Sequence, residues 1–100
     1  MIVHAILTIM DTVSGMKTVV AVVETGSFTA ASERLAMSKS LVSKYVGQVE
    51  SELGVRLFNR STRRLALTAS GQEYYQRAVQ LLDEFALLVD SVTGEQTAPK

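Results

Sequence analysis

Apolar residues recur with the spacing of an α-helix along most of the chain. The first such segment predicts a helix over residues 11–25, because apolar side chains three or four residues apart line one helix face. Asp11 is its candidate N-cap, and Gly26 ends it because glycine adopts the left-handed conformation without strain. We expect its core-facing side chains to be Val13, Met16, Val20 and Val23.

Two shorter apolar patterns follow, separated by a tight turn. Ser27 is the candidate N-cap of a helix over residues 28–36, and Ser38 is the candidate N-cap of a helix over residues 39–53. Gly54 ends the second of these helices. The buried faces are predicted to comprise Phe28, Ala31 and Leu35 in the first helix, and Val42, Val46, Val49 and Leu53 in the second.

A short two-stranded element is predicted next. Residues 57–58 and 65–67 combine apolar and β-forming side chains, and the second run alternates between the two faces of a strand. The connecting residues 59–63 are polar and basic. We therefore expect a hairpin with a positively charged tip.

The last predicted helix, over residues 69–92 with Thr68 as N-cap, is longer than one small domain needs. It carries two adjacent apolar stripes. The first consists of Tyr74, Ala78, Leu81, Phe85, Leu88 and Val92, and the second of Tyr75, Val79, Leu82, Ala86 and Val89. One stripe is expected to pack on its own domain and the other on a second copy; the alternative is that a C-terminal domain covers both. The predicted dimer interface comprises Tyr75, Ala78, Val79, Leu82, Phe85, Ala86 and Val89.

The order of these elements predicts the fold. Three helices, a two-stranded wing and a long C-terminal dimerisation helix make a mainly α, winged helix-turn-helix architecture. We divide the chain into an apolar, disordered extension (1–9), a winged helix-turn-helix (10–68), a dimerisation helix (69–92) and a flexible tail (93–100).

Composition excludes several classes of function. The chain has no cysteine, so it has no disulfide or thiolate metal site, and this fits a reducing compartment. No apolar stretch reaches the roughly 20 residues of a membrane span. One histidine, His4, lies in the extension, and no glycine-rich phosphate loop or carboxylate cluster is present. We expect no catalytic residue, no metal, no cofactor and no small-molecule ligand, and a cytoplasmic, nucleoid-associated protein.

Charge is uneven although the net charge is zero. Residues 33–64 hold seven Lys or Arg against three Asp or Glu, a local charge of +4, whereas residues 65–100 carry −3. A basic middle between acidic flanks indicates a nucleic-acid surface, although chance clustering on solvated faces gives the same pattern.

The predicted turn before residues 39–53 lets that helix protrude from the surface of the domain. In helix-turn-helix proteins the N-terminal residues of the second helix reach base edges. Hydroxyls and lysines there can bond to base edges or phosphates, although a solvated helix face is polar as well. The candidate DNA-binding residues of this turn and helix are Ser38, Lys39, Ser40, Ser43 and Lys44.

Arg60, Arg63 and Arg64 add a basic cluster on the predicted hairpin, shaped to enter a minor groove or grip phosphates. A surface cluster of ion pairs is the alternative, but few acids lie nearby in the sequence. Arg34 either reaches the DNA backbone or pairs with a local acid.

The residues in this order resemble a known family. Residues 26–35, 38–43 and 50–58, followed by Arg60, Arg63, Leu67, Thr68 and Gly71, are similar to the N-terminal signature of LysR-type transcriptional regulators. The resemblance covers residues 10–92. It implies a transcriptional regulator whose long helix is a dimerising linker helix, and which binds double-stranded DNA at an inverted repeat as a homodimer or higher oligomer.

The resemblance also implies roles for single residues. Lys39, Ser40, Ser43 and Lys44 match the family's base- and backbone-contacting positions, and Arg60 and Arg63 match its wing contacts. The start of the helix that meets a phosphate corresponds to Ser27, Phe28 and Thr29.

The chain departs from the family at several points. Gly47 and Gln48 stand where basic residues are common, and Val19 stands where phenylalanine is common. The resemblance implies that such regulators continue with a sensor domain, so we expect this chain to be either a DNA-binding fragment or a natural truncated form. The alternative function, which Gly47 and Gln48 favour, is an interaction module that pairs with full-length regulators without effective DNA binding of its own.

Overall fold

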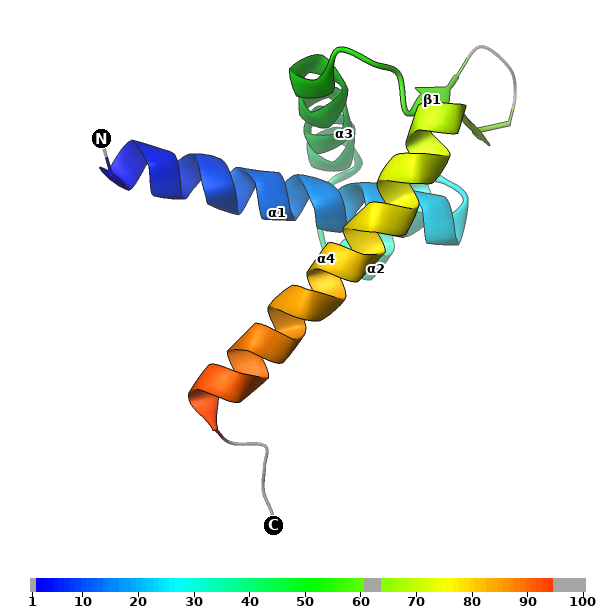
Figure 1. The fold of residues 1–100 in the computed structure, drawn as a ribbon. Coiled ribbons are helices and arrows are strands. Elements are labelled where there is room, and N and C mark those ends of the chain that lie inside the picture. The colour runs from blue at the N-terminus through cyan, green and yellow to red at the C-terminus, as the bar shows by residue number, and fades with distance from the viewer. Residues whose placement is uncertain (1, 61–63, 95–100) are drawn as a thin grey trace.

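The computed structural model describes the backbone of residues 2–60 and 64–94, and the side chains from Asp11 onward within those ranges. Its elements are α1 (Ile2–Thr25), α2 (Phe28–Leu35), α3 (Lys39–Leu53), β1 (Phe58–Asn59), β2 (Ala66–Leu67) and α4 (Ala69–Thr93). This order confirms the predicted mainly α, winged helix-turn-helix with a long final helix (Figure 1).

The first helix begins earlier than predicted. It starts at Ile2, so Asp11 lies inside α1 and does not cap it, and the expectation of a disordered extension is wrong for residues 2–9. The physical reason is that residues 2–10 contain neither glycine nor proline, so nothing in the sequence interrupts the helix before Asp11.

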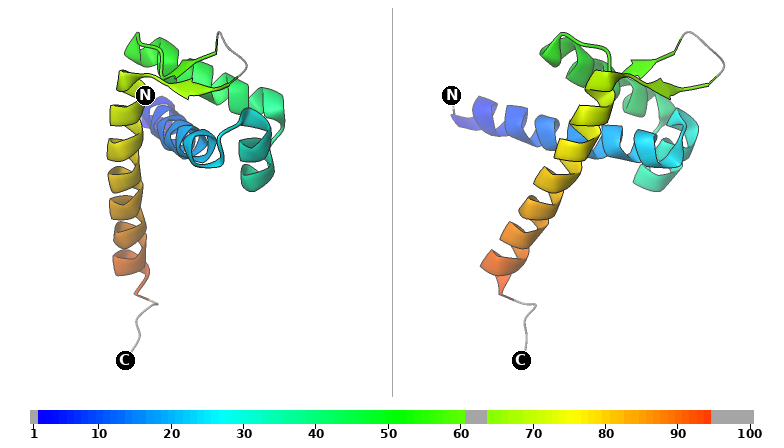
Figure 2. Two further views of the ribbon diagram at one scale, coloured as in Figure 1. Left: turned by 90° about the vertical axis from the view of Figure 1, so that its right-hand side faces the viewer. Right: turned by 45° about the vertical axis from the view of Figure 1, so that its right-hand side comes forward.

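The buried face of α1 is also wider than the predicted stripe. Val19 and Val22 are completely buried, whereas Val13, Met16 and Val20 are half-buried. α1 contacts α2, α3 and α4, so it is covered from several directions and not along one line. Figure 2 shows this arrangement, with α1 between α4 on one side and α2 on the other. Val23 packs, partly buried, against the same core.

Three helices begin where their caps predict. The hydroxyls of Ser27, Ser38 and Thr68 accept hydrogen bonds from the backbone N–H of Ala30, Leu41 and Gly71, at 3.0, 3.1 and 2.9 Å. α2 ends one residue earlier than predicted, because Ala36 adopts the left-handed conformation with φ of 55°. Gly26 and Gly54 end α1 and α3 with positive φ, as predicted.

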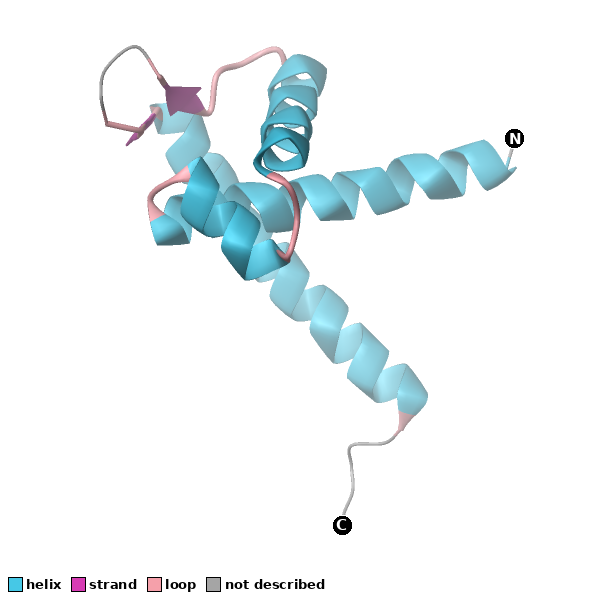
Figure 3. Cartoon of the chain, turned by 180° about the vertical axis from the view of Figure 1, so that it is seen from behind, coloured by secondary structure: helices cyan, strands magenta, loops and turns pink. Residues whose placement is uncertain are grey.

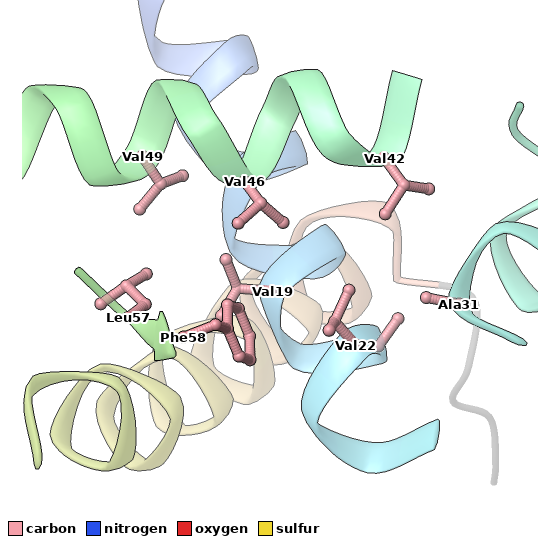
Figure 4. Close-up of a cluster of buried hydrophobic side chains, with 9 residues drawn as sticks. Val19, Val22, Ala31, Val42, Val46, Val49, Leu57 and Phe58 are labelled. Carbon is pink, nitrogen blue, oxygen red and sulfur yellow. The ribbon is translucent and has the colours of Figure 1, made fainter. Parts of the chain in front are cut away.

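The core lies where α3 packs on α1 and on the base of the wing (Figure 4). The predicted α3 positions Val42, Val46 and Val49 are buried, and they face Val19 and the wing residue Phe58. The fourth predicted position is wrong: Leu53 is 52% exposed. Leu53 borders open hollows that are also lined by Gly15 and Met16 of α1 and by Tyr74 of α4, so these helices cover it only in part.

The wing is shorter than predicted and is tied closely to α4. β1 and β2 are antiparallel, with Phe58 opposite Leu67, and each strand has two residues. Gly71, in the first turn of α4, lies so close to Leu57 that a Cβ at this position would collide with the Leu57 carbonyl oxygen. The wing and the start of α4 therefore form one packed unit.

The two halves of α4 have different surroundings, and this corrects the prediction of one inward stripe and one outward stripe. Gly71 and Ala78 are buried against the domain, whereas Leu81 and Val92 are 57% and 74% exposed. The extent to which the domain covers α4 thus changes along the helix axis and not around its circumference. Figures 1 and 2 show the C-terminal half of α4 extending away from the body. The predicted tail at residues 93–100 begins inside α4, whose last residue is Thr93, and mostly lies outside the described residues.

Candidate nucleic-acid interface

The start of α3 presents the four polar residues that the sequence singles out. Lys39, Ser40, Ser43 and Lys44 are all exposed, and together they border one shallow hollow on the surface. Because the valines of the opposite face are buried, the helix cannot rotate this surface inward without exposing them. Two ammonium groups and two hydroxyls therefore gather at a helix N-terminus, where the helix dipole also favours an anion.

Ser38 has a local structural role beside this surface. Its side-chain oxygen accepts the hydrogen bond from the Leu41 amide at 3.1 Å, so it caps α3. The hydroxyl hydrogen remains the part of Ser38 that can donate to a phosphate.

The start of α2 lies on the same side of the molecule as α3. Seen from behind, α2 and the first turns of α3 lie in front of α1 and α4 (Figure 3). Ser27 uses its hydroxyl oxygen as the cap of α2, and Thr29 is exposed. Phe28 is half-buried and packs edge-on against Phe58, with ring centroids 6.1 Å apart. Its ring therefore supports the wing more than it faces solvent.

A buried carboxylate joins α3 to the wing. Glu50 is 7% exposed, and one of its oxygens accepts hydrogen bonds from the amides of Leu57 and Phe58 at 2.8 and 3.2 Å. Its other oxygen accepts from Arg60 Nη2 at 3.1 Å. Burial acts to raise the pKa of Glu50, but these donors outweigh it and hold the pKa below its ordinary value. Sequence reasoning missed Glu50, although its position four residues after Val46 placed it on the apolar face of α3.

Glu50 changes the interpretation of the wing arginines. Arg60 pairs with this carboxylate and also lies over the Phe28 ring, with 5.4 Å between its guanidinium carbon and the ring centroid. The ion-pair alternative therefore holds for Arg60, which fixes the wing in place. Arg64 is exposed, and Arg63 lies outside the described residues.

A second carboxylate joins three helices. Glu24, near the end of α1, accepts a hydrogen bond from Arg34 of α2 at 2.7 Å and another from the Tyr75 hydroxyl of α4 at 3.0 Å. Arg34 thus pairs with a local acid, one of its two predicted alternatives. The Arg34 and Tyr75 hydrogen bonds hold the pKa of Glu24 below its ordinary value. The sequence offered no signal for this cluster, because Glu24 and Tyr75 are 51 residues apart.

The predicted dimer interface is only partly available to a partner. Ala78 is 2% exposed, so its assignment to the interface is wrong: it is small and fits against its own domain. Tyr75 donates its hydroxyl within the chain. Of the remaining predicted residues, Val79 and Leu82 are half-buried, whereas Phe85, Ala86 and Val89 are exposed on the overhanging half of α4.

The described part of the chain forms neither a membrane-spanning helix nor a cluster of metal ligands. In residues 2–60 and 64–94, no helix combines the length and the apolar character needed to cross a membrane. Among the described side chains, which begin at Asp11, no group of three or more Asp or Glu residues is placed to hold a metal ion.

The sequence matches a known family model. Residues 13–72 match the model of the bacterial regulatory helix-turn-helix proteins of the lysR family. The chain is 52% identical over 67 residues to the HTH-type transcriptional regulator CrgA of Neisseria meningitidis, a match that covers 67% of this chain and 22% of that protein. It is 39% identical over 85 residues to the HTH-type transcriptional activator TtdR of Escherichia coli, covering 85% and 27% respectively. These relatives are transcriptional regulators, which confirms the prediction that the chain is not an enzyme.

Solved structures agree with this match. The BenM_DBD/catB site 1 DNA complex contains a chain that superposes with a TM-score of 0.80 at 30% identity, covering 88% of this chain and 98% of that one. CrgA from Neisseria meningitidis, a LysR-type transcriptional regulator, superposes with a TM-score of 0.67 at 43% identity, covering 82% of this chain and 28% of that one. The chain therefore spans about a quarter of the length of its curated relatives.

Proposed function

Because the chain belongs to the lysR family of bacterial regulatory helix-turn-helix proteins, we propose that it binds specific double-stranded DNA sites as a homodimer. The observation that carries this proposal is the exposed start of α3, where Lys39, Ser40, Ser43 and Lys44 border one surface. α3 enters the major groove with this end. The BenM_DBD chain, which shares this fold over 88% of our chain, was solved in complex with DNA, and this supports DNA binding by our chain.

The proposed contacts divide into two kinds. Ser40 and Ser43 reach base edges, and Lys39 and Lys44 reach guanine acceptors or phosphate oxygens. The contacts to the DNA phosphate backbone come from the N-terminus of α2, the cap of α3 and the wing. The residues are Ser27, Thr29, Ser38, Arg63 and Arg64. Phosphate contacts provide affinity, which falls as salt rises, and base contacts provide the choice of site.

The overhanging half of α4 supports the homodimer. Leu81, Phe85, Leu88, Val89 and Val92 are between 42% and 74% exposed. A run of apolar side chains at helical spacing is stabilised when a second helix covers it. A two-fold pair of α4 helices places two copies of α3 on one duplex, which predicts an inverted-repeat site.

Selection from a pool of random duplexes tests the proposal. We expect the chain to enrich one inverted repeat, and the double variant Lys39→Ala, Lys44→Ala to enrich none above background. The variant Lys17→Ala, which removes an exposed positive charge from α1, is the matched control and is expected to enrich the wild-type site. Failure of the wild-type chain to bind any duplex at low salt would contradict DNA binding and favour a module that acts only by pairing with other regulators.

A further inference from the structure

The Glu24–Arg34–Tyr75 cluster has no part in the contacts proposed above, yet it joins the DNA-reading domain to α4. Glu24 lies in the last turn of α1, the helix that α4 crosses, and each of its carboxylate oxygens accepts a hydrogen bond from a different donor. Arg34 comes from the last turn of α2, and Tyr75 comes from the second turn of α4. One carboxylate thus links the element before the recognition helix to the proposed dimerisation helix.

The body contacts α4 only through its first half, where the helix start is packed with the wing. Its two buried residues, Gly71 and Ala78, are the smallest that a helix can place against a neighbour. Crossing angles are set by side chains that interlock between helices, and Ala78 contributes only a methyl group, so a hydrogen bond beside this contact can help to set the angle. Tyr74 packs half-buried against the core on one side, and the Tyr75 hydrogen bond holds the helix on the other.

We infer that Glu24, Arg34 and Tyr75 are positioning residues that set the direction of α4, and through it the half-site spacing that the dimer accepts. The inference rests on the proposed function, because spacing has meaning only for a dimer on DNA. Arg34 holds one oxygen of Glu24 at 2.7 Å, which turns the other oxygen toward the Tyr75 hydroxyl. All three side chains are accessible to solvent, so the cluster acts mainly on geometry and contributes little to stability.

The length of the overhang makes this direction matter. From Tyr75 to Thr93, α4 extends about 27 Å at about 1.5 Å per residue. A swing of about 10° would move its far end by about 5 Å, which exceeds the rise of one base pair, about 3.4 Å. In an antiparallel two-fold pair of α4 helices the partner domain would lie near that far end, so a small loss of angular control would become a shift of at least one base pair on the DNA.

The test compares spacing tolerance in two matched variants. Tyr75→Phe removes the hydroxyl that bonds to Glu24 and keeps the ring, whereas Tyr74→Phe removes a hydroxyl from the next residue without touching Glu24. Binding is measured on the selected inverted repeat and on duplexes with one base pair added or removed between its half-sites. Thermal unfolding of each variant is measured in parallel.

The wild-type chain and Tyr74→Phe are expected to lose about tenfold in affinity or more per inserted or deleted base pair, the size of effect that one misplaced contact produces. Tyr75→Phe is expected to lose less than about threefold on the same duplexes, with an unfolding temperature close to that of the wild-type chain. Glu24→Ala removes both hydrogen bonds and is expected to widen the tolerance at least as far.

The failure of the positioning role and the failure of DNA binding give different results. If Tyr75→Phe and Glu24→Ala both show the wild-type penalty for altered spacing, the positioning role is overturned while DNA binding stands. If the wild-type chain binds none of the duplexes, the proposed function fails first.

Discussion

α3 and α4 are both long, capped, amphipathic helices, but they leave opposite kinds of surface uncovered. α3 buries its valines and presents lysines and serines from its first turns. α4 buries only its first half and presents leucines, a phenylalanine and valines from its second half. Polar groups at a helix N-terminus fit a phosphate backbone and base edges, whereas an apolar overhang fits another apolar helix.

The comparison shows that amphipathic periodicity alone does not say what a helix face contacts. In both helices the apolar positions are spaced by three or four residues. What separates them is how far each helix extends beyond the body that covers it, and this depends on tertiary packing. Each helix's role can therefore be disrupted by substitutions that leave the other helix unchanged.

The largest effect is expected from a charge on the overhang of α4. Leu82→Glu places a carboxylate in the proposed helix pair, and burying it unpaired should raise the dimer dissociation constant by roughly 100-fold or more, about 3 kcal/mol. Sedimentation checks the result. Leu87→Glu is the control, because helical periodicity puts the 61%-exposed Leu87 on the other side of α4. A dimer of normal stability for Leu82→Glu would contradict the helix pair.

The next effect concerns the link between α3 and the wing. Glu50→Gln removes the charge that two buried amides and Arg60 share, and is expected to lower the free energy of unfolding by about 1–3 kcal/mol. Denaturant titration measures this change. Glu52→Gln, an exposed change on the same helix, should cost less than about 0.5 kcal/mol. Equal losses in the two variants would contradict the role of Glu50.

Lowering the pH should also weaken the link between Glu50 and the wing. Since folding lowers the pKa of Glu50, its contribution is fully present above its ordinary value of 4.5 and is lost as pH falls through the lower folded value. Wild-type stability should therefore drop more steeply below this pH than that of Glu50→Gln. Parallel slopes for the two proteins would argue against a charged Glu50.

A smaller, more specific effect is expected at the start of α3. Ser43→Ala and Lys44→Ala should each weaken binding to the selected site by about 1–3 kcal/mol, roughly 5- to 150-fold. Lys44→Ala should also reduce the salt dependence. Titration of a labelled duplex at several salt concentrations checks both effects, and the α4 control Leu87→Glu should bind normally. Wild-type affinity for both α3 variants would remove the proposed surface.

The smallest effect is expected at Gly47, farther along α3. A Cβ added there meets no atom within 4 Å, and its φ is not positive. Gly47→Ala should therefore stabilise the fold by about 0.5–1 kcal/mol through the unfolded state. Gly47→Lys should add about one unit to the salt slope of DNA binding if this face of α3 follows the phosphate backbone. An unchanged slope would confine the contact surface to the first turns of α3.

Local signals made much of this molecule predictable from its sequence. Ser27, Ser38 and Thr68 cap their helices as predicted, because capping depends on residues three positions apart. The bounds of α3 are those that its apolar pattern and Gly54 predict. The polar surface at the start of α3 followed from the same pattern, since its positions alternate with the buried valines.

The features that were missed depend on contacts distant in sequence. The partner of Arg60 is Glu50, and that of Tyr75 is Glu24, and neither pair follows from local periodicity. The burial of Ala78 and the exposure of Leu53 depend on how the helices pack against one another, which local periodicity does not give. A charged residue on an apolar face, as at Glu50, is the one signal that pointed toward a buried ion pair.

A chemical-shift titration of the labelled chain with its selected duplex tests the central claim most directly, because it reports on α3 and α4 at once. We expect the largest amide shifts at residues 38–44, and shifts near zero on the side of α4 that includes Asp83 and Leu87. The largest shifts along the overhang of α4, with residues 38–44 unchanged, would contradict the assignment of DNA to α3.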